Sequence, residues 1–341
     1  MRCGLHRTRP LLLAAVFCLP VILTSCSTGD DGVELGRDHV TAVVLPFLSQ
    51  MPFHIAAEEG FFAEQNLDVD FLRVGRNQDI MAVLAQGDVD VAAGMLTLNE
   101  LSLASAGAPI RVVAALTTST PDQCTFAAVV VRREHLESGA LDDRDQISRF
   151  RFDINPFIPL GYAVDELLRS YDLTLDDVDT VDLPPPAALD SLRRGLVDVT
   201  ADSEPWISMH VATGEAVIWR SVGELIPNYV HSVLMFGPAL IDERPEVGER
   251  FMVAILKAVR QLRLGKTARN LAIVEKASGL TAEQVAGACW PMPSHDARID
   301  ATAFRGYQEW SVGRGLLDRV LLENELFDHR FIDHANVELA K

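Results

Sequence analysis

The sequence predicts an α/β protein built from two doubly wound lobes. Three observations predict this class: the length of 341 residues with 48% hydrophobic residues, an alternation of strand-like and helix-like segments, and an internal repeat shared by the two halves. A chain of this length and apolar content exceeds one core of ordinary size, so two lobes are expected. With 23% charged residues, the composition is that of a folded protein.

The charge balance bears on the kind of partner. Asp and Glu number 48 against 30 Lys and Arg, and the formal net charge is −18. Because such a chain repels phosphate backbones, a nucleic-acid partner is excluded. A small-molecule solute is the expected partner.

The first 25 residues have the layout of an export signal. Arg2, Arg7 and Arg9 precede the apolar run 11–24, which is shorter than the roughly 20 residues of a bilayer span. The run ends in Leu-Thr-Ser-Cys26, which resembles a bacterial lipobox. The resemblance implies a signal peptide over 1–25, a flexible tether over 26–38, and Cys26 carrying a lipid anchor with acyl chains such as palmitate. The alternative is an ordinary signal peptide with a coincidental cysteine.

The remaining cysteines are Cys124 and Cys289. An exported chain permits a disulfide between them, which needs Cα atoms roughly 5.5–6 Å apart, and the sequence leaves both states open. No CxxC pair exists and the histidines are scattered, so neither a metal nor a cofactor is expected. Asp328-His329 with Asp333-His334 is interpreted as an exposed polar turn near the carboxyl end.

The body of the chain begins with a β-α-β-α pattern. Residues 41–45 form a short apolar run typical of a buried strand, and residues 53–62 have apolar positions typical of a helix that ends or bends at Gly60. Residues 67–72 alternate with period two, and residues 79–86 return to helical spacing. Such crossovers join parallel strands, and ligands bind beyond the carboxyl ends of these strands.

The internal repeat supports two lobes. Residues 84–91 recur as residues 192–199 with matching Leu, Gly, Val, Asp and Val. In each copy a helix ends, Gly87 or Gly195 takes a left-handed cap position, and valines enter a strand. Residues 180–183 supply the strand that precedes the second copy. Each lobe therefore presents strand ends to a ligand site between them.

Several motifs carry a family resemblance. The string Phe53–Val69, with its Gly-Phe-Phe and Leu-Asp-Val elements, resembles periplasmic solute-binding proteins for nitrate, sulfonates, taurine and thiamine-precursor pyrimidines. Residues 86–91, 106–110 and 204–206 extend the resemblance, which covers residues 41 to about 240. It implies a type II periplasmic-binding-protein fold with strand order 2-1-3-n-4 and a two-segment hinge. It also implies delivery of a solute to the permease subunits of an ABC transporter.

The resemblance also implies domain boundaries. Lobe one is expected over 39–118 plus 232–341, and lobe two over 119–231. The crossovers are expected near 117–131 and 228–240. A helix over 247–264 is expected to pack back on lobe one, with Leu264 among its core residues. The protein is expected to be a monomer.

The candidate site residues lie in loops that follow strands. In lobe one they are Phe47, Leu48, Ser49, Gln50, Arg76, Asn77, Met95, Thr97 and Thr117. In lobe two they are Asn155, Phe157, Asp202, Glu204 and Trp206. His231, with Ser232 beside it, is expected on the crossover that returns to lobe one.

Their chemistry suggests a flat or amine-bearing ligand. Phe47, Phe157 and Trp206 are predicted to enclose a ring, and Asp202 and Glu204 to accept hydrogen bonds from amines. Alternatives stay open for five of the candidate residues. The loop of Arg76 suits a position facing water as well as one facing the ligand. Phe157 and Trp206 are also typical packing residues, Glu204 suits a helix cap, and His231 suits a buried crossover histidine.

The sequence argues against small anions, because the lobe-two helix opens with the apolar run 157–160, and its proline has no N–H to donate. Ser49-Gln50 stand where the pyrimidine-binding branch commonly has Asn-His, and this departure counts against a pyrimidine solute. The expected function is a lipid-anchored solute-binding component of an ABC importer on the extracytoplasmic face of the cell membrane, without catalysis. The alternatives are a lyase or precursor synthase on the same fold, or a receptor for a sulfonate or nitrate anion.

Overall fold

A computed structural model describes residues 36–45, 47–72, 77–119, 123–290 and 292–341. The chain from Arg37 onward forms one compact unit. The signal peptide, the lipobox with Cys26, Arg76 and the side chain of Asn77 lie outside the described residues. In the part described, no helix has the length and apolar character needed to cross a bilayer.

The first sheet has the strand order β2-β1-β3-β10-β4. Its strands are β1 (Asp38–Val43), β2 (Leu67–Leu72), β3 (Val91–Gly94), β4 (Arg111–Ser119) and β10 (Tyr229–Phe236). Strands β1, β2 and β3 are parallel, whereas β10 runs antiparallel to both β3 and β4. The predicted order 2-1-3-n-4 is confirmed, with β10 as the strand that returns from the second lobe.

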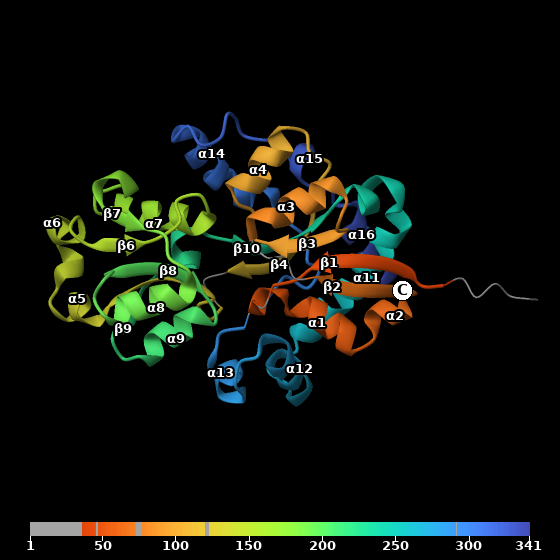
Figure 1. The fold of residues 1–341 in the computed structure, drawn as a ribbon, viewed down its shortest axis with the longest axis horizontal. Helices are drawn as coiled ribbons and strands as arrows, with labels where there is room; N and C mark the ends of the chain where they lie inside the picture. The colour runs from red at the N-terminus through yellow and green to blue at the C-terminus, as the bar shows by residue number, and fades with distance from the viewer. Residues whose placement is uncertain (1–35, 46, 73–76, 120–122, 291) are drawn as a thin grey trace, which may run out of the picture. The chain divides into compact units, whose positions relative to one another are not determined.

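The second sheet repeats this plan with the order β7-β6-β8-β5-β9. Its strands are β5 (Ala127–Arg132), β6 (Arg151–Asp153), β7 (Asp179–Val181), β8 (Val199–Ser203) and β9 (Ala216–Ser221). Strand β6 is parallel to β7 and β8, and β5 is antiparallel to β8 and β9. Figure 1 shows the two sheets with their own helices, and so confirms the two-lobed α/β class.

Helices cover both sheets. The first part of the chain and the carboxy-terminal part contribute η1 (Leu48–Gln50), α1 (Met51–Glu58), α2 (Phe61–Glu64), α3 (Asn77–Gln86), α4 (Leu98–Ser105), the π-helical η4 (Ala239–Glu243), α11 (Pro245–Leu262), α12 (Ala268–Ser278), α13 (Ala282–Gly287), η5 (Ala301–Phe304), α14 (Arg305–Gly313), α15 (Glu323–Leu326) and α16 (Arg330–Glu338). The middle of the chain contributes α5 (Arg133–Glu137), η2 (Ala140–Asp142), α6 (Arg144–Ile147), α7 (Pro159–Arg169), η3 (Leu175–Asp177), α8 (Pro185–Arg193), α9 (Trp206–Ala212) and α10 (Val222–Leu225).

The repeat has the predicted local structure in both lobes. Gly87 follows α3 with φ 80° and Gly195 follows α8 with φ 69°, and both angles lie in the left-handed region. Each glycine reverses the chain from a helix into a strand whose first valine, Val91 in β3 and Val199 in β8, is fully buried. The shared turn thus builds the same β-α-β unit twice.

The long helix α11 packs on the first lobe, as predicted. It lies against α1, α2 and β2, and its Phe251 stacks on Phe62 with ring centroids 5.1 Å apart. Lys257 of the same helix pairs with Glu64 of α2. The predicted core position of Leu264 is wrong, because α11 ends at Leu262 and Leu264 is 71% exposed.

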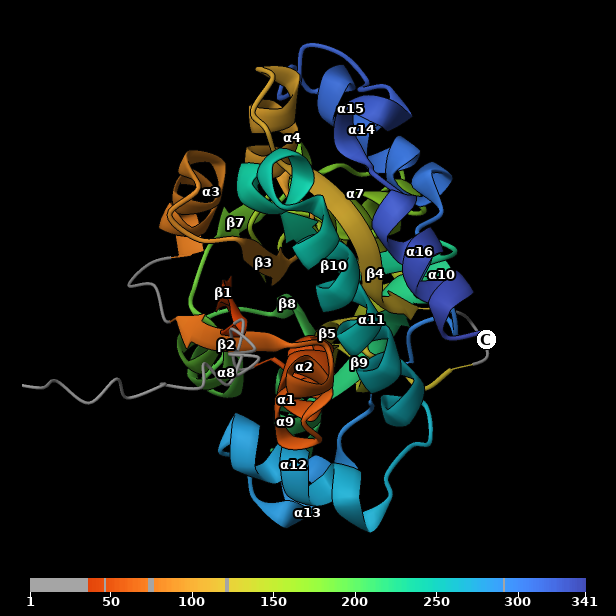
Figure 2. The same cartoon turned by 90° about the vertical axis from the view of Figure 1, so that its right-hand side faces the viewer.

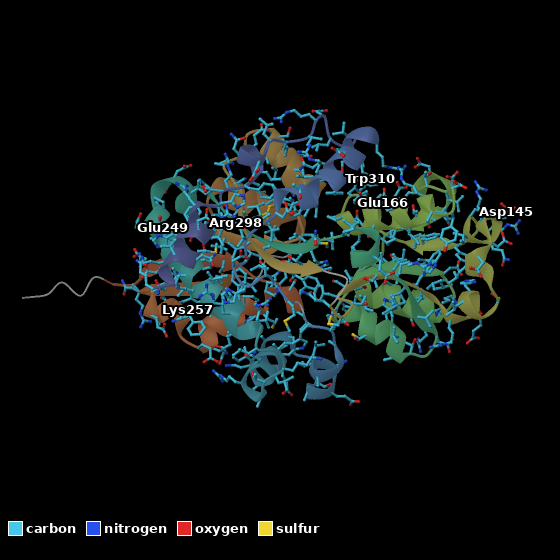
Figure 3. The ribbon with its side chains drawn as sticks, turned by 180° about the vertical axis from the view of Figure 1, so that it is seen from behind. Asp145, Glu166, Glu249, Lys257, Arg298 and Trp310 are labelled. Atoms are coloured by element: carbon cyan, nitrogen blue, oxygen red, sulfur yellow. A yellow bond between two sulfur atoms is a disulfide. The ribbon has the colours of Figure 1, made fainter. Side chains whose placement is uncertain are left out.

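The carboxy-terminal segment also reaches the second lobe, which the sequence did not indicate. The indole Nε1 of Trp310 in α14 donates to Asp165 Oδ2 of α7 over 2.8 Å. Figure 3 shows Trp310 beside Glu166, the next residue of α7. Figure 2 shows α15 close to α4, and these two helices are in contact. The segment therefore packs on both lobes.

A disulfide joins Cys124 to Cys289 with their Cα atoms 5.7 Å apart. Cys124 lies in the crossover between β4 and β5, and Cys289 follows α13. The pairing that the sequence left open is therefore formed in the structure. It ties the first crossover to the carboxy-terminal segment, 165 residues along the chain.

Candidate functional site

The strands that cross between the lobes carry buried polar atoms without partners. Within the described residues, Thr117 Oγ1 and Ser119 Oγ of β4 and His231 Nδ1 and Ser232 Oγ of β10 are buried and form no hydrogen bond. Thr117 and Ser232 are no more than 1% exposed, and His231 is 5% exposed. Because a buried polar group normally has a partner, this concentration identifies a candidate binding site.

A β-bulge shapes this site. In the ladder between β10 and β4, Val230 pairs with Thr118 and Ser232 pairs with Thr117, so His231 is one extra residue on β10. A bulge interrupts the regular pairing and redirects side chains. The imidazole of His231 lies edge-on to the rings of Phe126 and Tyr229, with centroids 5.1 and 5.8 Å away.

Burial determines the charge of His231. Its complete desolvation lowers the pKa to about 4, so the imidazole is neutral at neutral pH. A neutral imidazole offers one hydrogen-bond donor and one acceptor. Burial likewise raises the pKa of Tyr229, which keeps its phenol protonated.

The loop after β1 approaches the crossover strands. Turn η1 lies against both β4 and β10, and Ser49 and Gln50 are buried there. Gln50 Oε1 accepts a hydrogen bond from Leu45 N over 2.6 Å, and its Nε2 donates to Ala93 O over 3.1 Å. Gln50 thus ties the ends of β1 and β3 together, and Leu48 lies in the hydrophobic core.

The loop after β3 contains a helix cap. Thr97 Oγ1 accepts from Asn99 N over 3.2 Å, and Glu100 Oε2 accepts from Thr97 N over 2.6 Å. Thr97 therefore serves the start of α4. Met95 lies nearer the crossover, with its Sδ 3.9 Å from the Tyr229 hydroxyl that donates to it.

The lobes touch at the start of α7. The carbonyl oxygen of Phe157 accepts from Leu98 N over 3.3 Å and from the Tyr307 hydroxyl over 2.9 Å. Asn155 Oδ1 accepts from Phe157 N over 2.8 Å and holds this turn in place. Phe157 is 53% exposed as a residue, and the contacts between the lobes are made by its main chain.

The end of β8 supplies two carboxylates. Glu204 is 2% exposed and accepts from the Ser208 hydroxyl over 2.7 Å and from Cys289 N over 3.1 Å. Burial raises the pKa of Glu204. Glu204 therefore has the capping role that the sequence left open, whereas Asp202 accepts from Ser203 N and lies 3.8 Å from His210 Nε2.

Phe47, Phe157 and Trp206 stay candidates for enclosing a solute ring, since rings on either side of a solute contact the solute rather than one another. Phe47 and Trp206 are half-buried, and among the ring pairs of the described chain, no pair joins Phe47, Phe157 and Trp206 to one another. The aromatic rings at the crossover are Phe126 and Tyr229, which the sequence analysis missed together with Ser119. The sequence did contain a sign of this part of the site, because the polar pair 231–232 interrupts the otherwise apolar run 229–236.

Surface hollows in the described part of the chain include the following two. One, of about 420 Å³, is bordered by the disulfide residue Cys124, Lys266 and Trp290. The other, of about 460 Å³, is bordered by Leu322 and His329. Neither is bordered by the unpartnered groups of β4 and β10.

Solved structures share this architecture. The periplasmic nitrate-binding protein NrtA from Synechocystis PCC 6803 matches with TM-score 0.71 and 12% identity over 90% of this chain and 89% of its own. The alkanesulfonate-binding protein SsuA from Xanthomonas axonopodis pv. citri, bound to MOPS, matches with TM-score 0.65 and 16% identity over 86% and 98%. The desulfurization enzyme DszB matches with TM-score 0.65 and 16% identity over 89% and 100%. These similarities establish the fold of periplasmic binding proteins.

The family is established by the sequence itself. The chain matches the NMT1-like family over residues 37–276 and belongs to it. This range includes both sheets and both crossovers. No protein of curated function matches the sequence.

Proposed function

We propose that this protein is the lipid-anchored, extracytoplasmic solute-binding component of an ABC importer. It captures a small heteroaromatic or amine-bearing molecule between its lobes, releases it unchanged to permease subunits, and acts as a monomer. Binding shifts an equilibrium between open and closed arrangements of the lobes. The fold shared with nitrate- and sulfonate-binding proteins supports this function.

The unpartnered polar atoms of β4 and β10 carry the proposal. Leaving a buried polar group without a hydrogen bond costs about 1–3 kcal/mol. Thr117, His231 and Ser232 have this property within one short stretch of two paired strands. A solute that forms hydrogen bonds with them recovers that cost, which gives these polar side chains a role in binding.

Reversible binding is favoured over catalysis by the surroundings of His231. An activated nucleophile needs a base within hydrogen-bond reach and a group that orients the base. The Nδ1 of His231 has no partner among the described residues, and the hydroxyls of Thr117 and Ser232 are likewise unpaired. We therefore place this chain with the binding proteins and not with the enzyme that shares the fold.

Ligand-induced stabilisation tests the receptor function. A solute library containing nitrate, sulfonates, pyrimidines and amines is screened against the full chain in detergent by thermal unfolding. A solute bound at about one hundred times its Kd stabilises the native state by about 2.7 kcal/mol. Turnover of a stabilising compound, detected by mass spectrometry, contradicts the receptor function. So does the lack of stabilisation by every compound.

The lipid anchor is tested at Cys26. Cells grown with an alkyne analogue of palmitate are expected to label the protein, and Cys26→Ala is expected to abolish the label because the acyl acceptor is removed. Ser25→Ala is the matched control, since a small residue before the cysteine keeps the lipobox resemblance. Persistent labelling of the Cys26→Ala chain contradicts the anchor.

A further inference from the structure

We infer that the end of the solute buried between the lobes is uncharged, and that Thr117, His231 and Ser232 bind it through a group that both donates and accepts hydrogen bonds, as a carboxamide or lactam does. This inference rests on the proposed function and specifies its solute class. It excludes nitrate and sulfonates, the solutes of the structural neighbours.

The three side chains match such a group in their hydrogen-bonding chemistry. The hydroxyls of Thr117 and Ser232 each donate one hydrogen bond and accept others, and neutral His231 donates from one nitrogen and accepts at the other. The two hydroxyl residues lie opposite each other in the strand ladder, and His231 is the bulge residue beside Ser232. An oxyanion can accept from both hydroxyls and from one imidazole nitrogen, but it donates nothing to the other imidazole nitrogen, which a carboxamide or lactam N–H can reach.

No buried side chain of the described residues brings a positive charge to these groups. The buried polar residues of the described chain include carboxylates, hydroxyls, amides and histidines, but neither lysine nor arginine. Burial alone lowers the pKa of His231, without a contribution from a neighbouring charge. An anion buried without a counter-charge pays a large desolvation cost.

The helix amino termini beyond the strand ends also offer an anion fewer donors than usual. Helix α1 has Pro52 and helix α7 has Pro159 in the first turn, where a proline has no N–H. In α4, the amide of Leu98 already donates to Phe157 O. In α9, the amide of Ser208 donates to Glu204 Oε2. Each of these four helices therefore lacks, or already uses, one of its first-turn backbone donors, which weakens it as an oxyanion site.

Carboxylates at the end of β8 oppose an anion as well. Glu204 lies next to the site, because its N–H donates to Phe126 O over 2.9 Å and the Phe126 ring contacts His231. Asp202 precedes it on the same strand and is only partly exposed. These groups suit a neutral molecule, with any amine of the solute directed toward Asp202.

The first test needs no ligand. Thr117→Val and Ser232→Ala remove hydroxyls that have no partner in the fold, so the free protein is expected to keep or raise its unfolding midpoint. Thr180→Val and Ser102→Ala, at exposed positions, are the matched controls. A midpoint lowered by more than about 4 °C, which corresponds to roughly 1–2 kcal/mol, would show that the hydroxyls serve the fold and would overturn the inference.

The second test uses four probes. Nicotinamide and uracil present an uncharged amide or lactam edge, and nitrate and ethanesulfonate are small anions. The neutral probes are expected to raise the unfolding midpoint of the full chain. The double variant Thr117→Val/Ser232→Ala is expected to bind these probes about tenfold more weakly, which corresponds to about 1.4 kcal/mol of binding free energy. The Thr180→Val/Ser102→Ala control is expected to bind them unchanged.

Three outcomes overturn the inference. They are a saturable shift with either anion, no shift with the neutral probes, and a shift with the neutral probes that survives in the double variant. Saturable binding of an anion leaves the proposed receptor function standing, because the protein would then be a receptor for a different class of solute. Failure of the whole solute library contradicts the receptor function itself, so the two failures are distinguishable.

Discussion

At the scale of single residues, burial decides the chemistry of the candidate site. His231 is one of nine histidines in the chain, yet its position between Phe126 and Tyr229 removes it from water and lowers its pKa to about 4. Glu204 shows the opposite effect, since burial raises the pKa of its carboxyl group. In both cases desolvation disfavours the charged form.

His231 therefore makes the protein acid-sensitive. Its folded-state pKa of about 4 lies below the ordinary 6.5 of an unfolded histidine, so the unfolded chain binds the proton first. Stability is expected to fall as the pH drops from about 6.5 to about 4, by about 3 kcal/mol relative to the non-titrating variant His231→Gln. Urea denaturation across this pH range measures the difference. The exposed control His295→Gln is expected to keep the wild-type profile, and a wild-type profile in His231→Gln contradicts the assignment.

At the scale of elements, the two copies of the helix–glycine–strand turn determine where each sheet begins its third strand. Gly87 and Gly195 hold positive φ angles between α3 and β3 and between α8 and β8. A side chain with a Cβ is strained in this region of the backbone. The sequence motif was therefore informative because its glycine has a local conformational reason.

Alanine substitution tests the equivalence of the two turns. Gly87→Ala is expected to lower the free energy of unfolding by about 1 kcal/mol, because alanine disfavours a positive φ. Gly195→Ala is expected to lower it by at least as much, because its added Cβ would also overlap Nη1 of Arg132 and displace that side chain. Gly94→Ala is the control, since its added Cβ meets no atom within 4 Å. Urea denaturation compares the three variants. An unchanged stability of Gly87→Ala and Gly195→Ala would refute the shared mechanism.

At the scale of the whole molecule, the carboxy-terminal segment connects parts that are distant in the sequence. The disulfide ties Cys289 to Cys124 in the first crossover, and Glu204 of the second lobe accepts a hydrogen bond from the amide of the same Cys289. Tyr307 of α14 donates to the Phe157 carbonyl at the start of α7. These contacts restrain the crossover and the meeting point of the lobes.

Removing the disulfide is expected to destabilise the protein. The double variant Cys124→Ala/Cys289→Ala frees a long loop of the unfolded chain, and the expected loss is about 2–5 kcal/mol. Urea denaturation of the oxidised wild type, the reduced wild type and the variant measures it, and the last two are expected to agree. Equal midpoints for the oxidised and reduced wild type would contradict a stabilising role.

Tyr307 tests the contact between the lobes. Tyr307→Phe removes the hydroxyl that donates to Phe157 O, and the loss of about 1 kcal/mol is expected to raise the open population about fivefold. Small-angle scattering without ligand measures this as an increase in the radius of gyration. Tyr171→Phe, which removes a hydroxyl from the second lobe alone, serves as control. An unchanged scattering curve for Tyr307→Phe would show that this contact does not hold the lobes together.

The sequence alone determined the α/β class, the two sheets and the turns at Gly87 and Gly195. These features depend on hydrophobic periodicity and backbone conformation, which act over a few neighbouring residues. Only the tertiary structure decided which candidate side chains remain available to a solute. Gln50, Thr97 and Glu204 have partners within the fold, whereas Thr117 Oγ1 and His231 Nδ1 have none among the described residues. Hydrogen-bond satisfaction depends on partners brought together from distant parts of the chain, so no local pattern reports it.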